Sequence, residues 1–302
     1  MKELVVISGK GGTGKTSVVA AFASLASNKV LADCDVDAAD LHLVLQPEVR
    51  SRHEFRCGHE AAINPQTCKG CGFCLSQCRF EAIQPVVAKA GIVYRVEPLA
   101  CEGCGVCVDV CPAKAIDFPE RLAGEWCLSD TRHGPMVHAR LGIAAENSGK
   151  LVSLVRQQAR RLAQNENKDL VLVDGPPGIG CPVIASITGA SLVLIVTEPT
   201  LSGQHDLKRV AELARHFHIP TVACINKWDL NPGMSEAIEA SALALGAKPL
   251  GRIRYDRAVT AAQVAGKSVL EFSSDGVSRD IKDLWIGIES LLGSDDSSKD
   301  TV

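Results

Sequence analysis

The sequence has no long apolar run and no marked excess of charge of either sign. No stretch approaches the roughly 18 successive apolar residues of a membrane span. The first apolar run, Leu4 to Ile7, is too short for the core of a secretory signal peptide. The formal net charge of −3 also gives no basic excess of the kind that favours nucleic acid or anionic lipid. We therefore expect a cytoplasmic protein without membrane insertion and without a nucleic-acid partner.

Cysteine, by contrast, is abundant. The chain of 302 residues contains 13 cysteines, and eight of them lie between Cys68 and Cys111 in two groups with the same internal spacing. A secreted disulfide framework would need an export signal and usually a shorter chain. The regular spacing therefore predicts metal ligation in a reducing compartment.

Short β-type runs alternate with helical patterns over most of the chain. The apolar runs are Leu4–Ile7, Val30–Ala32, Leu170–Val173, Leu192–Thr197 and Thr221–Ile225. This alternation predicts an α/β fold with a mostly parallel sheet flanked by helices. Between about Arg56 and Glu120 the composition changes to Cys, Gly and Pro, which indicates an inserted small α+β domain. We expect a discontinuous larger domain of residues 1–55 and 121–293, the inserted domain at 56–120, and a flexible polar tail at 294–302.

Two helical patterns in the larger domain bear on which surfaces are exposed. In the segment that begins at Leu151, the three arginines Arg156, Arg160 and Arg161 lie mostly away from the apolar positions, which predicts a solvated face. The apolar stripe from Ile281 to Leu292 fits either a helix packed on the sheet or an amphipathic membrane helix. We favour packing, because a membrane helix needs flanking Lys and Arg and this one runs into Ser and Asp.

Residues Gly9 to Thr16, with the letters GKGGTGKT, lie between the first strand and an alanine-rich helix. This is the context that a phosphate-binding loop requires, because glycines let backbone N–H groups converge on phosphate and the helix adds its positive N-terminus. Lys15 is expected to neutralise the β- and γ-phosphates, and Thr16 is expected to ligate Mg²⁺. The full set of predicted nucleotide-binding residues is Gly9, Lys10, Gly11, Gly12, Thr13, Gly14, Lys15, Thr16, Ser17, Gly178 and Asn226.

The early lysine at Lys10 resembles the deviant Walker A motif of the MinD, ParA, Mrp and nitrogenase-iron-protein group. In that family this lysine reaches the phosphates of a partner subunit, so the resemblance implies that Lys10 acts in trans and that catalysis requires a homodimer or a heterodimer with a paralogue. The Asp-rich segment after the second strand is similar to the next family motif. The resemblance assigns the attacking water to Asp35, with Asp33 and Asp40 as alternatives. A turn of solvated aspartates is the competing interpretation.

Asp174 follows the apolar run Leu170 to Val173, as a Walker B carboxylate that holds Mg²⁺ through water would. The next residues, 175–178 (GPPG), resemble switch II, whose glycines allow backbone contact with the γ-phosphate. Asn226 resembles the family's adenine-reading asparagine. Residues 226–229 (NKWD) also fit the pattern by which GTPases read guanine, so ATP is favoured by Lys10 and GTP stays open.

Each cysteine group has the spacing C-x2-C-x2-C-x3-C, which resembles a bacterial two-cluster ferredoxin. The resemblance implies two [4Fe-4S] clusters in which the fourth cysteine of each group ligates the other cluster. Cluster 1 is then held by Cys68, Cys71, Cys74 and Cys111, and cluster 2 by Cys101, Cys104, Cys107 and Cys78. Zinc is disfavoured because it prefers paired C-x2-C hooks. Purely structural clusters remain an alternative.

The five remaining cysteines are Cys34, Cys57, Cys127, Cys181 and Cys224. Most are expected to be buried apolar side chains. Cys181 follows the switch II-like segment, near where the nitrogenase iron protein has a cluster-bridging cysteine, but no second matching cysteine is evident. His133 and His138, in a segment without assigned structure, are expected to be packing or surface residues.

The resemblance covers nearly the whole chain: a MinD/Mrp-type ATPase with an inserted ferredoxin domain, similar to the ATPases of the orange-protein complex. It implies a Mg-dependent ATPase that binds ATP and ADP. Its switched dimer would couple nucleotide state to the iron–sulfur module, for metal-cluster assembly or electron delivery to a protein partner. A cluster carrier is a first alternative, disfavoured because no C-x-x-C follows Cys224. A MinD-like spatial regulator is a second.

Overall fold

The computed structural model describes residues 1–88, 91–142 and 148–294. The chain forms two compact units. Of the described residues, the larger unit contains Met1–His53, Trp126–Arg140 and residues 148–294, and the smaller contains Glu54–Glu125 together with Leu141 and Gly142. Both boundaries fall inside long strands, so the inserted unit begins and ends without a separate linker.

A nine-stranded sheet organises the larger unit, in the order β13-β12-β11-β1-β10-β2-β9-β8-β3. The six pairs that join β13 through to β9 are parallel. The strands are β1 (Lys2–Ser8), β2 (Lys29–Asp33), β3 (Glu48–His59), β8 (Glu120–Thr131), β9 (Gly134–Leu141), β10 (Leu170–Pro177), β11 (Leu192–Thr197), β12 (Thr221–Asn226) and β13 (Lys248–Ile253). Because parallel strands point the same way, the carboxyl ends of β1, β2, β10, β11 and β12 meet at one edge.

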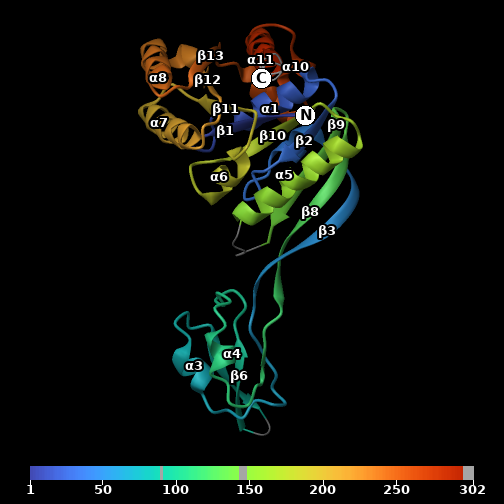
Figure 1. Cartoon of the computed structure of the whole chain (residues 1–302), viewed down its shortest axis with the longest axis vertical. Coiled ribbons are helices and arrows are strands. Elements are labelled where there is room, and N and C mark those ends of the chain that lie inside the picture. The colour runs from blue at the N-terminus through green and yellow to red at the C-terminus, as the bar shows by residue number, and fades with distance from the viewer. Residues whose placement is uncertain (89–90, 143–147, 295–302) are drawn as a thin grey trace, which may run out of the picture. The chain divides into compact units, whose positions relative to one another are not determined.

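Helices cover both faces of this sheet (Figure 1). They are α1 (Lys15–Leu25), α2 (Leu41–Leu45), α5 (Ser148–Asn165), α6 (Cys181–Ile187), α7 (Leu201–His216), α8 (Pro232–Ala244), α9 (Arg257–Val264), α10 (Val269–Phe272) and α11 (Val277–Ser294). Leu4 and Val6 of β1 share a core with α1, α2 and α11. Val5 and Ile7, equally buried, point to the opposite face by strand alternation, where α5 to α8 pack. The predicted α/β fold is confirmed.

The apolar stripe of α11 is packed into the protein, as predicted. Ile281, Leu284, Trp285 and Ile288 are all buried, and the Trp285 ring lies 4.9 Å from that of Phe22 on α1. Among the described residues, no helix is long and apolar enough to cross a membrane. Residues 295–302, almost all of the predicted tail, lie outside the described residues, and Ser294 is the last residue of α11.

The interpretation of the three arginines of α5 as a solvated face is wrong for Arg156. Its side chain is buried, donates from Nε to Glu3 Oε1 at 2.8 Å, and reaches the Ala185 carbonyl at the end of α6. Arg160 binds the other Glu3 oxygen, and only Arg161 is fully exposed. A helical pattern shows which face an arginine occupies, but it does not reveal a carboxylate on a neighbouring strand.

Residues 120–141 are also more ordered than the sequence indicated. They form β8 and β9, which extend the main sheet, and Met136 and Val137 are fully buried there. His138 lies 2.8 Å from Ser129 Oγ, consistent with a packing role. The apolar residues of this segment are too few for a clear strand signal, and its pairing with β2 supplies the missing order.

The smaller unit contains two short helices and two small antiparallel pairs of strands. They are α3 (Phe73–Gln77), α4 (Val106–Asp109), β4 (Ala62–Ile63) with β7 (Ile116–Asp117), and β5 (Ile83–Ala88) with β6 (Gly91–Val96). Its core is small and includes Ala61, Ile83, Val96 and Ile116, with several cysteines packed against it. Below about 40 to 60 residues, a core of this size is usually supplemented by disulfides or metal.

Candidate functional site

The glycine-rich loop connects β1 to α1 at the carboxyl edge of the sheet. Gly9 allows α7 to approach, because a Cβ there would lie 2.2 Å from that of Asp206. Gly14 has a φ of +89° and sits against the Asn226 amide, where a Cβ would be 2.3 Å from Nδ2. These two positions require glycine sterically. Gly12 also favours glycine because its φ is +80°, although the space around it is open, as it is around Gly11.

Three of the predicted catalytic groups meet at the start of α1. The Lys15 ammonium donates to Asp174 Oδ1 at 2.5 Å and lies 3.5 Å from Asp35 Oδ2. It also lies 3.4 Å from the Thr16 hydroxyl. Asp174 comes from β10, which continues to Pro177, so the switch II-like residues begin within the strand and not after it. The structure therefore places the Lys15 charge between Asp35, which follows β2, and Asp174 of β10.

Burial makes the charges at this site costly. Burial and the neighbouring Asp174 raise the pKa of Asp33 well above its ordinary value. Burial also raises the pKa of Asp35, although Lys15 opposes this shift. Burial alone would lower the pKa of Lys15, but Asp174 and Asp35 outweigh it and hold that pKa above its ordinary value. An added divalent cation would relieve this excess of carboxylate charge.

Unpartnered oxygens at the site fit a magnesium ion. Among the described residues, Asp33 Oδ2, Asp174 Oδ2 and Thr13 Oγ1 are buried without a hydrogen-bond partner. Oxygen ligands of this kind, usually with waters and phosphate oxygens, are those that Mg²⁺ prefers. Asp40, by contrast, is exposed at the start of α2 and takes no part in this cluster.

Lys10 is held within its own chain. Its Nζ lies 2.7 Å from Glu198 Oε1 and donates to Ser202 Oγ at 2.8 Å. Lys227 Nζ lies 3.3 Å from the other Glu198 oxygen and donates to the Gly12 carbonyl. Burial opposes the charge on Glu198, but these two lysines keep the pKa of Glu198 below its ordinary value. Sequence reasoning missed Glu198, although its position directly after β11, at the same edge as the loop, was a usable signal.

The remaining predicted nucleotide residues have partners inside the protein. Asn226 donates from Nδ2 to the Thr13 carbonyl at 2.7 Å, and its Oδ1 accepts from the Lys227 backbone. The Gly178 N–H donates to the Ser8 carbonyl, and the Ser17 hydroxyl accepts from Gln263. Asn226 therefore supports the shape of the loop, and its predicted contact with the base stays a prediction.

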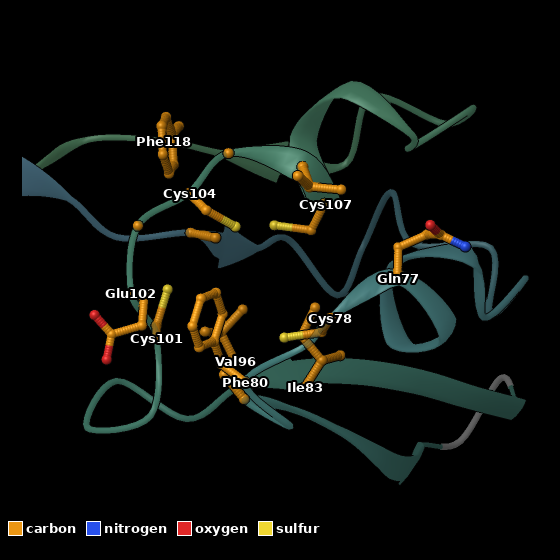
Figure 2. A pocket seen from close by; sticks show the side chains of 15 residues that line it. Gln77, Cys78, Phe80, Ile83, Val96, Cys101, Glu102, Cys104, Cys107 and Phe118 are labelled. Carbon is orange, nitrogen blue, oxygen red and sulfur yellow. The ribbon is translucent and has the colours of Figure 1, made fainter.

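In the smaller unit, two cavities are each lined by four cysteines. The first, which we call site 2, contains about 390 Å³ of empty space and is lined by Cys101, Cys104, Cys107 and Cys78. Figure 2 shows these side chains around a common space, with the sulfur atoms of Cys104 and Cys107 pointing toward each other. Apolar residues, among them Phe118, complete the wall. The structure thus brings Cys78 to the second cysteine group.

The second cavity, which we call site 1, is lined by Cys68, Cys71, Cys74 and Cys111 and contains about 320 Å³. Here too the fourth cysteine comes from the other group. The Ala115 backbone N–H donates to Cys111 Sγ at 3.3 Å. Both cavities therefore present four sulfur atoms in the exchanged arrangement that suits two [4Fe-4S] clusters.

Glycines shape the cysteine loops in the same way in both groups. Gly70 and Gly103 have φ values of +64° and +62°, and a Cβ at either would lie within 2.4 Å of a backbone oxygen of the unit. Burial raises the pKa of Cys74, and it raises the pKa of Cys107 to about 11. Iron binding would supply the positive charge that favours the thiolates, with release of protons.

The other cysteines lie outside these cavities. Cys34, Cys127 and Cys224 are buried, and burial raises the pKa of Cys224. Cys57 is partly exposed. Cys181 is exposed as the first residue of α6, close to Gly149 at the start of α5.

Comparisons with known proteins agree with the description of both the larger and the smaller unit. Residues 61–118 match the family model of the 4Fe-4S dicluster domain. The chain is 32% identical to the uncharacterized protein MJ0578 of Methanocaldococcus jannaschii over 76% of this chain and 79% of that protein. It is 25% identical to the uncharacterized protein MJ0579 of the same organism over 90% and 94% of the two chains.

The structure resembles the septum site-determining protein MinD of Pyrococcus horikoshii, solved with Mg-ADP, with a TM-score of 0.59 and 16% identity over 97% of this chain and 98% of that one. This likeness establishes the fold of the larger unit as that of the MinD/ParA P-loop ATPases. The chain belongs to the family of MJ0578, and it combines the MinD/ParA P-loop fold with a 4Fe-4S dicluster domain.

Proposed function

We propose that this protein is a nucleotide-switched dimeric ATPase whose ATP binding and hydrolysis control an iron–sulfur module, for metal-cluster assembly or electron delivery to a protein partner. One observation carries the proposal. A single chain contains a phosphate loop with Lys15 between Asp35 and Asp174, and also two cavities that each present four cysteine thiols.

At the nucleotide site, each charged residue has a separate role. Lys15 leaves its carboxylate partners and neutralises the β- and γ-phosphates, while the backbone N–H groups of the loop bind phosphate oxygens. Thr16 and Asp174 would hold Mg²⁺, which when bound would supply positive charge to the phosphate groups. Asp35, less buried than Asp174, orients the attacking water.

Lys10 links hydrolysis to dimer formation in this proposal. Within one chain its ammonium is neutralised by Glu198, so it is not available to a nucleotide. In a dimer it would exchange Glu198 for the phosphates of the partner, whose larger negative charge favours the exchange. The clusters, when bound, supply one-electron chemistry. The cysteines of sites 1 and 2 hold them within largely apolar walls.

The test is to purify the full chain anaerobically, measure its iron and sulfide, and record EPR spectra of the reduced protein with ADP, Mg-ATP and a non-hydrolysed ATP analogue. We expect about eight iron atoms per chain. We also expect dimer formation with ATP, and an EPR signal that changes between the ADP and ATP states. The Lys15→Gln variant should keep its iron and lose the response to nucleotide.

Two results would overturn the proposal. An unchanged oligomeric state and an unchanged EPR signal with ATP would show that the two units are not coupled. Clusters that transfer readily to an apo-acceptor protein would point instead to a cluster carrier, because clusters that serve electron transfer should stay bound through repeated redox cycles.

A further inference from the structure

The two halves of the smaller unit are equivalent beyond their cysteines. Cys68-Lys69-Gly70-Cys71-Gly72 corresponds to Cys101-Glu102-Gly103-Cys104-Gly105. The segments after the fourth cysteines correspond as well. Glu81 and Lys114 each lie three residues after one, and both adopt a left-handed conformation, with φ values of +53° and +49°. Residues at these matched positions can therefore be compared directly.

At two matched positions the charges are opposite. Lys69 lines site 1, and Lys114 lies between Ala113 and Ala115, which also line site 1. Their counterparts are acidic. Glu102 lines site 2 beside Cys101 (Figure 2), and Glu81 lies between two residues that line site 2, Phe80 and Ala82.

Charged residues beside the other lining residues preserve this contrast. Arg95 and Asp117 each lie between a residue that lines site 1 and one that lines site 2, so they do not distinguish the sites. At site 2, Arg79 follows Cys78, but Glu60 and Glu97 adjoin the lining residues Ala61 and Val96. With all of these counted, the charges sum to +2 at site 1 and to −3 at site 2. The sites share a cysteine pattern and a largely apolar wall, and they differ in charge.

We propose that these charges make the module polarised, so that an electron resides preferentially at site 1, flanked by Lys69 and Lys114, and site 2 is the harder to reduce. The proposal rests on the proposed function, since it requires both sites to hold clusters. The physical reason is that reduction adds one negative charge, which nearby lysines stabilise and nearby glutamates oppose.

This arrangement gives electron passage a direction. With both clusters bound, an electron from a low-potential one-electron donor that reached site 2 would pass to site 1, so that site 2 would lose one electron and site 1 would gain one. No proton, bond or ligand changes in this step. The side chains that set the direction are exposed, so the effect should be moderate and should decrease at high salt.

The test is an EPR-monitored redox titration of the full chain, loaded anaerobically and reduced with dithionite. The site 1 variant is Lys69→Glu with Lys114→Glu, and the site 2 variant is Glu81→Lys with Glu102→Lys. Each variant places at one site the residues that the other site already carries at the matched positions, and Glu81 and Lys114 share a left-handed backbone conformation, which limits strain. Glu54→Lys, an exposed change in the same unit that lines neither cavity, is the matched control.

We expect two separate one-electron steps in the unchanged protein. The site 1 variant should lower the higher potential and the site 2 variant should raise the lower one. Each variant should change the equilibrium constant for the distribution of one electron between the two sites about tenfold. This corresponds to a shift of about 59 mV in one of the two potentials. The Glu54→Lys control should change neither potential. The single changes Lys69→Gln and Glu102→Gln provide smaller shifts of the same sign if a double variant loses iron.

Equal potentials in the unchanged protein, or shifts of the opposite sign in the variants, would overturn the polarity. That outcome is distinct from failure of the proposed function. If iron and sulfide show two full sites and only the polarity fails, the nucleotide-coupled module stands. If the unchanged protein holds no reducible clusters, both fail.

Discussion

Lys10 and Glu198 form an ion pair within one chain, with Nζ 2.7 Å from Oε1. Lys10 follows β1 and Glu198 follows the neighbouring strand β11, so the parallel sheet brings them to the same edge. A lysine expected to serve a partner's nucleotide is thus neutralised in cis. In the proposed mechanism, part of the free energy of ATP binding is used to separate this pair.

Removing the Glu198 charge should make dimer formation easier. In the Glu198→Gln variant we expect dimers at an ATP-analogue concentration about fivefold lower, because release of Lys10 no longer breaks an ion pair worth about 1 kcal/mol. Sedimentation velocity at several analogue concentrations measures this shift. Glu212→Gln, an exposed change on the same helix α7 as Ser202, should leave it unchanged. Weaker dimerisation in Glu198→Gln would contradict the assigned role.

Asp35 should affect hydrolysis more than binding. In Asp35→Asn we expect ATP hydrolysis to fall by about 100-fold to 1,000-fold, since the water loses its orienting carboxylate. ATP-dependent dimers should still form, because Lys15 and the backbone N–H groups of the loop stay available to bind the phosphates. Steady-state phosphate release and sedimentation measure the two effects separately. Asp37→Asn, an exposed change two residues later, is the control. Equal losses of ATP hydrolysis in Asp35→Asn and Asp37→Asn would show that Asp35 is not a catalytic residue.

The exchanged fourth cysteines can be tested by combining variants. Cys78→Ala should cost about four iron atoms, and adding Cys104→Ala should cost no more, because both line site 2. Adding Cys71→Ala instead should empty both sites, because Cys71 lines site 1. Iron analysis after anaerobic reconstitution gives the result, and Cys57→Ala should leave the iron content unchanged. The reverse pattern would place Cys78 in site 1.

The buried pair of Glu3 and Arg156 should be important for stability. Arg156→Ala should lower the free energy of unfolding by about 3 kcal/mol, because Glu3 then stays buried with only Arg160 as an ionic partner. Arg161→Ala, one turn further on the exposed side of α5, should change it by less than about 0.5 kcal/mol. Denaturant unfolding measures both. If both variants changed the free energy of unfolding by similarly small amounts, water or the end of the helix would be compensating for the loss of Arg156.

Glu271 should make stability depend on pH in acid. Hydrogen bonds from Arg132 and the Ser268 backbone lower the pKa of Glu271 to about 2. A carboxyl group whose folded pKa is lowered contributes stability above its unfolded pKa of about 4.3, and this contribution disappears as pH falls toward 2. We expect Glu271→Gln to be less stable than the unchanged protein by about 1 kcal/mol at pH 7, a value reduced by solvent screening.

The difference between these two proteins should narrow steadily between pH 5 and pH 2, as followed by denaturant unfolding at fixed ionic strength. A Glu236→Gln control, on the exposed side of α8, should show no such change. A constant difference across this range would show that Glu271 acts through packing and not through its charge.

The sequence determined those features that depend on local spacing. The glycines and Lys15 of the phosphate loop, the Asp174 that follows an apolar run, and the repeated cysteine spacing each reflect chemistry that needs given residues at given separations. For the same reason the α/β class followed from the alternation of strands and helices. The opposite charges of Lys69 and Glu102 were also present in the printed sequence, but they gain meaning only once the two halves are seen to be equivalent.

Only the tertiary structure decided which distant residues meet. Glu198 near Lys10, Glu3 near Arg156, and the pairing of β9 with β2 all join segments far apart in the chain. No local pattern encodes such contacts, because strand order and helix packing set them through burial of the whole core. Polar residues such as Arg156 were therefore the hardest to place, since their burial depends on a partner that the surrounding sequence does not reveal.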